Sequence, residues 1–77
     1  SGSSLTYAGT VPTAGHTISA DLSRFPLGTK LRVGDTVYTV EDCGSAVKGN
    51  VLDIYFPSHS EALQYGRQTA DVYRIGG

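Results

Sequence analysis

Short runs of alternating or β-branched apolar residues, separated by glycine and proline, dominate the hydrophobic pattern of this chain. Such runs are typical of β-strands bounded by tight turns. The clearest pair is 30–33 with 36–41, because only Gly34 and Asp35 separate the two runs, which is the length of a β-hairpin turn. The pattern predicts strands over residues 5–8, 16–21, 30–33, 36–41, 51–56 and 69–75.

One segment has helical signals instead. Ser58 lies three residues before Glu61, which is the spacing of a capping box, and Gly66 is suited to end a helix. The sequence therefore predicts one short helix between Ser58 and Gly66. Short strands, tight turns and a single helix together favour a small closed β-barrel, which has no exposed sheet edge.

Composition limits the chain to one domain, because 77 residues leave room for one small hydrophobic core. Residues 1–4, Ser-Gly-Ser-Ser, resemble a cloning scar or flexible tail, so we expect the domain to span 5–77.

The formal net charge of −1, without a block of like charges, argues against nucleic acid or anionic lipid as a partner. No apolar run reaches the length of a membrane span. A single cysteine excludes an intramolecular disulfide, and we expect neither a metal nor an organic cofactor.

Three aspartates, Asp21, Asp42 and Asp53, stand beside predicted strands. Asp42 and Asp53 are eleven residues apart and bracket a loop that contains two glycines and Lys48. A catalytic acid must hold its proton near neutral pH, and apolar neighbours or a nearby carboxylate have that effect. Asp53 fits this role best, because the residues around it in 51–56 are largely apolar. The alternative is that all three acids only cap turns.

Several motifs together resemble the 3D domain, a family named for its three aspartates. They are Ser19-Ala-Asp21, Pro26-Leu-Gly-Thr29, Glu41-Asp42-Cys43-Gly44, Val47-Lys48-Gly49-Asn50, Leu52-Asp53-Ile54-Tyr55, and Glu61-Ala62 with Gly66-Arg67. The resemblance covers residues 13–75, and the same domain forms the barrel of MltA-type lytic transglycosylases. It implies a mainly β fold, a six-stranded double-psi β-barrel with one short helix. It also implies cleavage of bacterial peptidoglycan between N-acetylmuramic acid and N-acetylglucosamine, which leaves a 1,6-anhydro end.

The resemblance assigns roles to individual residues. Asp53 falls on the family's general acid/base, and Asp42 and Asp21 fall on the acids that support it. In such an enzyme the sugar's own C6 hydroxyl attacks C1, so the protein needs no nucleophile of its own. Five further residues are expected to contact the substrate: Lys48, Gly44, Ser45, Gly49 and Tyr55.

Three departures from the family pattern leave other functions open. Ser45 replaces the second glycine of a Gly-Gly pair, Cys43 stands where Thr or Val is common, and the stretch between Gly15 and Asp21 is shortened. Since glycine permits close backbone approach, Ser45 is also compatible with a non-catalytic module that binds cell-wall glycan within a larger cell-wall or phage protein. A third interpretation is a hydrolase in which Asp42 or Asp21 activates water.

Peptidoglycan glycan strands are the expected ligand, with a protein partner as an alternative for the non-catalytic module. The protein would act outside the cell or in the cell wall, as part of a larger or processed secreted protein. The oligomeric state is open, and a swapped or paired dimer is one of the alternatives, because exchange of an element is a low-cost route to dimers.

Overall fold

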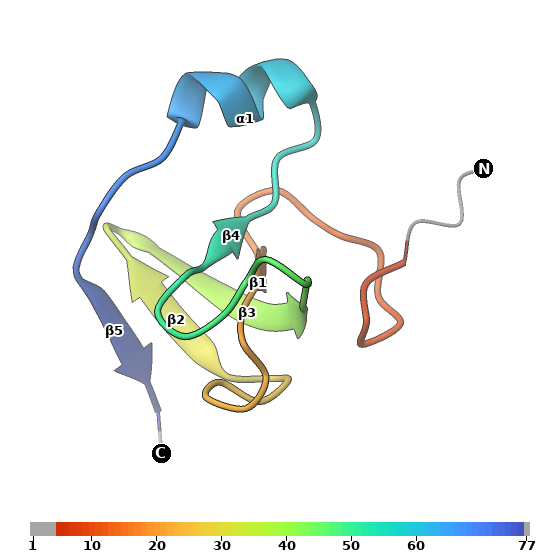
Figure 1. The fold of residues 1–77 in the computed structure, drawn as a ribbon, viewed down its shortest axis with the longest axis vertical. Coiled ribbons are helices and arrows are strands. Elements are labelled where there is room, and N and C mark those ends of the chain that lie inside the picture. The colour runs from red at the N-terminus through yellow and green to blue at the C-terminus, as the bar shows by residue number, and fades with distance from the viewer. Residues whose placement is uncertain (1–4, 77) are drawn as a thin grey trace.

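The computed structural model describes residues 5–76 (Figure 1). The tail expected over residues 1–4 lies outside the described residues. Five strands and one helix follow one another along the chain: β1 Thr17–Ser19, β2 Lys30–Val33, β3 Thr36–Asp42, β4 Asp53–Ile54, α1 His59–Tyr65 and β5 Val72–Ile75.

The five strands form one sheet in the order β4-β1-β3-β2-β5. β2 and β3 make the predicted hairpin, in which Val33 pairs with Thr36 across the turn that contains Gly34. Gly34 has a φ of 61°, a backbone conformation that glycine adopts without steric cost. β1 is parallel to β3, whereas β4 and β5 are antiparallel to β1 and β2, respectively.

The protein is mainly β with one short helix, as predicted, but the described residues form an open five-stranded sheet. The six-stranded double-psi barrel is not confirmed. Residues 5–8 are not a strand, because Thr6 N–H bonds to the Thr10 carbonyl and folds the segment back on itself. The strand predicted over 51–56 is reduced to β4, since Val51 N–H bonds to the Lys48 carbonyl in a turn.

The helix has the predicted ends. The Ser58 side chain accepts a hydrogen bond from Glu61 N–H at 3.2 Å, and the Ser58 hydroxyl lies 2.9 Å from Glu61 Oε2. At the other end Gly66, with a φ of 67°, donates its N–H to the Ala62 carbonyl at 3.0 Å. These local bonds fix α1 at both ends, although none of its residues is buried.

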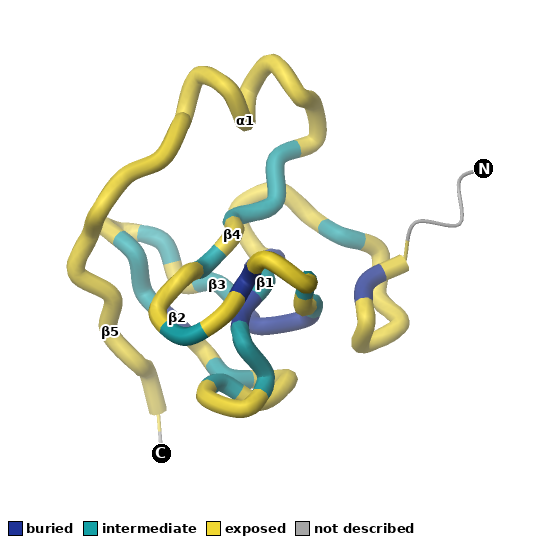
Figure 2. The backbone as a smooth tube through the Cα atoms, in the orientation of Figure 1, coloured by how far each residue is buried: buried dark blue, intermediate teal, exposed yellow. Residues whose placement is uncertain are grey.

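The core is small and lies at the centre of the sheet. Four apolar side chains are fully or almost fully buried: Ile18, Ala20, Leu31 and Val40. Figure 2 shows that the buried residues cluster around β1 and β3, whereas α1 and β5 are exposed along their whole length. α1 and β5 therefore contribute little to the core, whereas Leu52 and Ile54, which precede α1, are partly buried against it.

Candidate functional site

Strand pairing brings two of the three aspartates to the same end of the sheet. Ser19 at the end of β1 pairs with Asp42 on one side and with Asp53 on the other. Neighbouring strands lie about 4.8 Å apart, so the backbones of Asp42 and Asp53 are separated by roughly 10 Å. Asp21 follows Ser19 by two residues. The acids that the sequence singled out thus converge around the end of β1.

Asp21 is engaged with the backbone of the loop between β3 and β4. Its Oδ2 accepts Gly49 N–H at 2.9 Å, and its Oδ1 accepts the Ser23 hydroxyl at 2.7 Å and Ser23 N–H at 3.1 Å. Chiefly the bond from Gly49, followed by those from Ser23 and a smaller effect of the Lys48 charge, lowers the pKa of Asp21 to about 2. Asp21 is therefore ionised, and its hydrogen bond from Gly49 holds the loop in place.

Asp42 holds a second backbone segment. Its Oδ1 accepts Tyr7 N–H and Cys43 N–H, each at 3.0 Å. Next to these bonds, Ala8 N–H donates to the Glu41 carbonyl oxygen at 2.9 Å. Asp42 thus fastens the segment that contains Tyr7 and Ala8 to the end of β3, beside the site.

Glu41 is a further acid at this end of β3, and only 9% of it is exposed. Its Oε1 accepts the buried Thr17 hydroxyl at 2.7 Å, and its Oε2 lies 3.2 Å from His16 Nε2. Burial raises the pKa of the Glu41 carboxyl, but the bond from Thr17 and the His16 ring outweigh this effect, so the net pKa lies below its ordinary value. Glu41 thus links β3 to β1 and has a structural role.

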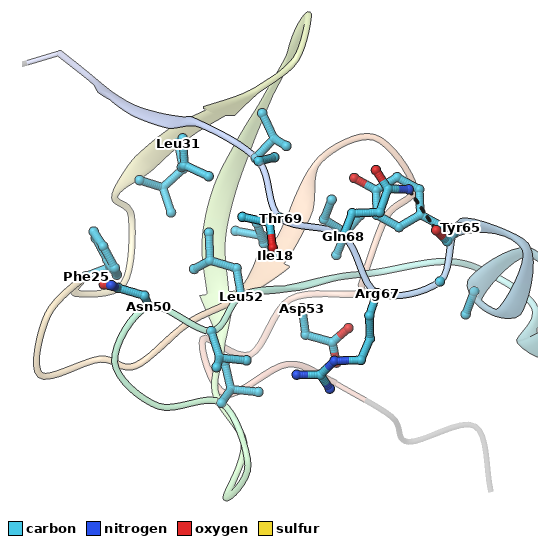
Figure 3. A pocket seen from close by; sticks show the side chains of 18 of the residues that line it. Ile18, Phe25, Leu31, Asn50, Leu52, Asp53, Tyr65, Arg67, Gln68 and Thr69 are labelled. Carbon is cyan, nitrogen blue, oxygen red and sulfur yellow. Dashed lines mark hydrogen bonds between the residues drawn. The ribbon is translucent and has the colours of Figure 1, made fainter.

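Asp53 has a different environment from the other acids: it is exposed, so the apolar neighbours expected from the sequence do not bury it. It lines a cavity of about 880 Å³ between the sheet, the end of the β3–β4 loop and the segment from Ala62 to Ala70. Neither Asp21 nor Asp42 lines this cavity. Figure 3 shows Asp53, Arg67 and Asn50 among the side chains that line this cavity. Of the three predicted acids, Asp53 alone is placed to meet a ligand in this cavity.

The cavity combines apolar walls with a few polar groups. Ile18, Leu31 and Leu52 form part of its wall on the side of the core. On the opposite side Phe56 and Tyr65 form an aromatic pair with ring centroids 5.1 Å apart and an interplanar angle of 42°. Apolar walls with a small number of convergent polar groups are the usual composition of ligand sites in proteins.

The structure places the five predicted substrate contacts around the cavity rather than in its lining. Lys48, Gly44, Ser45, Gly49 and Tyr55 do not line it, whereas their neighbours Ala46, Val47, Asn50 and Phe56 do. A Cβ at Gly44 would lie 3.3 Å from Val47 Cγ2, so this glycine allows the loop to pack closely. Direct contact between the five residues and a substrate stays a prediction.

Four lining residues were missed as site residues: Arg67, Asn50, Phe56 and Tyr65. A signal for two of them was present, because Asn50 and Arg67 belong to the motifs that carry the family resemblance. Phe56 and Tyr65 gave no such signal, since they meet only when α1 is placed beside β4.

Two further features of the described chain bear on the kind of site. Within residues 5–76, no three His, Cys, Asp or Glu side chains are grouped so that they could hold a metal ion. None of the helices in the same range is long and apolar enough to cross a membrane.

Comparison with known proteins identifies the family. The family model of the 3D domain matches residues 16–76, and the chain therefore belongs to the 3D domain family. It is similar to the putative cell wall shaping protein YabE of Bacillus subtilis (strain 168), with 39% identity over 56 residues. It is also similar to the cell wall-binding protein YocH of the same organism, with 41% identity over 56 residues. Both matches cover 71% of this chain, but only 14% of YabE and 20% of YocH.

Proposed function

We propose that this domain is a peptidoglycan lytic transglycosylase that acts in the cell wall, with Asp53 as its general acid/base. One observation carries the proposal: among the three aspartates of the family pattern, Asp53 lines the cavity, while Asp21 and Asp42 bind backbone N–H groups beside it. The names of the relatives, a cell wall shaping protein and a cell wall-binding protein, support a place in the cell wall.

The proposed reaction needs one carboxyl group. Protonated Asp53 donates its proton to the glycosidic oxygen as the bond from that oxygen to C1 of N-acetylmuramic acid breaks. The C6 hydroxyl of the same sugar forms a new bond to C1 and returns its proton to the Asp53 carboxylate. The products are a free 4-hydroxyl on N-acetylglucosamine and a 1,6-anhydro ring, and the acid is regenerated without water or a cofactor.

Asp21 and Asp42 support this reaction through position rather than chemistry. Asp21 holds the loop that leads into β4 and hence to Asp53, and Asp42 lies on the strand next but one to Asp53. The family's six-stranded barrel belongs to the same proposal. One backbone bond joins residues 5–8 to the end of β3, from Ala8 N–H to the Glu41 carbonyl, but this segment is folded back on itself and is not a sixth strand.

The second candidate is a non-catalytic module that binds cell-wall glycan. Its support is the printed name of YocH, a cell wall-binding protein. The hydrolase interpretation has less support, because an inverting hydrolase needs a second carboxylate that is available to activate water. Asp21 and Asp42 instead accept backbone N–H groups.

Mass spectrometry of the soluble products released from purified peptidoglycan separates these functions. We expect 1,6-anhydro products from the wild type and from Asp35→Asn, a matched change at the exposed hairpin turn, and none from Asp53→Asn. Urea unfolding of the three proteins should give similar midpoints, since Asp53 is exposed. Products with reducing ends would instead establish a hydrolase, and murein binding without products would establish the binding module.

A further inference from the structure

We propose that Arg67 is a specificity-determining residue that binds a carboxylate of the glycan strand beside Asp53. The inference rests on the proposed function and names a chemical property of the substrate. N-acetylmuramic acid carries a lactyl carboxyl group, which is free when the strand lacks stem peptides, and stem peptides carry carboxylates of their own. Each source offers the same chemistry to a guanidinium group.

Local bonds fix the position of Arg67 at the edge of the cavity. It directly follows Gly66, whose N–H bonds to the Ala62 carbonyl and ends α1. On its other side the Gln68 Nε2 donates to the Tyr65 carbonyl at 2.7 Å, the bond drawn as a dashed line in Figure 3. The backbone of Arg67 is thus held between two bonded residues, and its side chain lines the same cavity as Asp53.

The Arg67 guanidinium is available to a ligand. Within residues 5–76 it makes neither a side-chain hydrogen bond nor an ion pair, and the same is true of the Asp53 carboxylate. Arg32, by comparison, donates to the Gly34 carbonyl at 2.9 Å and lies over the Tyr73 ring, 4.6 Å from its centroid. A guanidinium presents a planar set of donors that matches the two oxygens of a carboxylate.

The neighbours of Arg67 fit a sugar that carries such a carboxylate. The Phe56–Tyr65 pair lines the same cavity as Arg67 and offers apolar ring surface to the less polar face of a sugar ring. Gln68, the next residue in the sequence, brings an amide group to the same cavity, and an amide is suited to an N-acetyl group. An acid, a cation, an aromatic pair and an amide that line one cavity together favour N-acetylmuramic acid at the sugar subsite next to the cleaved bond.

Steady-state kinetics and binding on three forms of soluble glycan strand test this inference. The strands carry stem peptides, or have lost them so that the lactyl carboxylate is free, or have every carboxylate blocked by amidation. The proteins are the wild type, Arg67→Gln, Arg67→Lys and the matched control Arg24→Gln, which changes an exposed arginine outside the cavity. Urea unfolding of each variant verifies that it is folded.

We expect Arg67→Gln to raise KM and Kd about 10- to 100-fold on strands with a free carboxylate, the range for a hydrogen bond to a charged group. On these strands Arg67→Lys should lie between the wild type and Arg67→Gln, because lysine keeps the charge but not the planar set of donors. On blocked strands all Arg67 variants should match the wild type, and Arg24→Gln should have no effect on any strand. A larger effect on stem-free strands identifies the lactyl carboxylate as the ligand, and a larger effect on stem-bearing strands identifies the peptide.

Equal constants for the wild type and Arg67→Gln on all three strands would overturn this inference and leave the proposed function intact. An equal loss on carboxylate-bearing and blocked strands would also overturn it, because Arg67 would then act on the shape of the cavity. A wild type that neither binds nor cleaves any strand would overturn the proposed function, and the inference with it.

Discussion

Replacement of Glu41 by alanine should destabilise the fold strongly without altering the lining of the cavity that holds Asp53. The carboxylate accepts the hydroxyl of Thr17, which is 2% exposed, and loss of this acceptor leaves a buried donor unsatisfied. A hydrogen bond to a charged group contributes about 1.5–3 kcal/mol. The His16 contact adds at most about 1 kcal/mol, because 47% of the His16 side chain is exposed. We therefore expect a loss of about 2–4 kcal/mol.

That loss is large for so small a domain. At about 0.05–0.15 kcal/mol per residue, 77 residues give a total free energy of unfolding of about 4–12 kcal/mol. Urea unfolding should show a clear decrease in midpoint, and the melting temperature should fall by about 4–8 °C for each kcal/mol lost. Glu41→Gln should lose only about 1 kcal/mol, because the amide oxygen still accepts the Thr17 hydroxyl.

The dependence on pH gives a second test of the same bond. Because the pKa of Glu41 is lowered in the folded state, its contribution is present above the ordinary pKa of 4.5 and is lost as the pH falls through the lower folded value. The wild type should therefore lose stability below about pH 4.5 more steeply than Glu41→Gln. Asp71→Ala, at an exposed site, is the control for removal of a surface carboxylate.

A change of less than about 0.5 kcal/mol in Glu41→Ala, the range of ordinary surface substitutions, would refute this reasoning. Activity per folded molecule should stay near that of the wild type, because Glu41 does not line the cavity. A variant that is fully stable and inactive would instead place Glu41 in the catalytic machinery.

Two further predictions concern the loop that precedes β4. Asp21→Asn should lower the urea midpoint at pH 7 and make stability depend less on pH between about pH 4 and pH 2. The Asp21 carboxylate stabilises the fold above its ordinary pKa of 3.8, and this contribution is lost as the pH falls through about 2. A pH dependence as steep as that of the wild type would contradict the role of Asp21 in holding the loop. Gly49→Ala should lower the free energy of unfolding by about 1–2 kcal/mol, because Gly49 has a φ of 61°, which strains an alanine. An added Cβ would meet no atom within 4 Å, so backbone strain alone would cause the loss. Urea unfolding measures it, and an unchanged midpoint would show that the loop relaxes.

The elements predicted best are those whose signals are local. The β2–β3 hairpin follows from the two-residue turn at Gly34 and Asp35, and α1 follows from Ser58 and Gly66 at its ends. The composition of 51–56 favours a longer strand than β4, because β-branched residues indicate a tendency to pair but not the length of the partner. β1 offers a partner only to Asp53 and Ile54.

The sequence pointed to part of the candidate site but not to most of the residues that line the cavity. Asp42 and Asp53 both pair with Ser19, but of the two only Asp53 lines the cavity, and the roles assigned to them stay predictions. The donor that engages Asp21 is the backbone N–H of Gly49, 28 residues away, and no sequence motif reports such a bond. Arg67 belongs to one of the sequence motifs, but the sequence assigned it no role. Only the folded chain brings Arg67 to the cavity that Asp53 lines.

The exposed position of α1 and β5 bears on how a long polymer would reach Asp53. Within residues 5–76, β5 pairs with β2 and with no other strand, through four residue pairs. The segment that carries α1 and Arg67 forms another wall of the cavity. This wall can separate from the sheet when the hydrogen bonds between β2 and β5 break, which requires a small fraction of the free energy of global unfolding. On the proposed function, a glycan strand would then enter sideways at any point along its length, without being threaded from an end. We would accordingly expect endolytic cuts, which shorten strands in the middle, rather than stepwise removal of sugars from the termini.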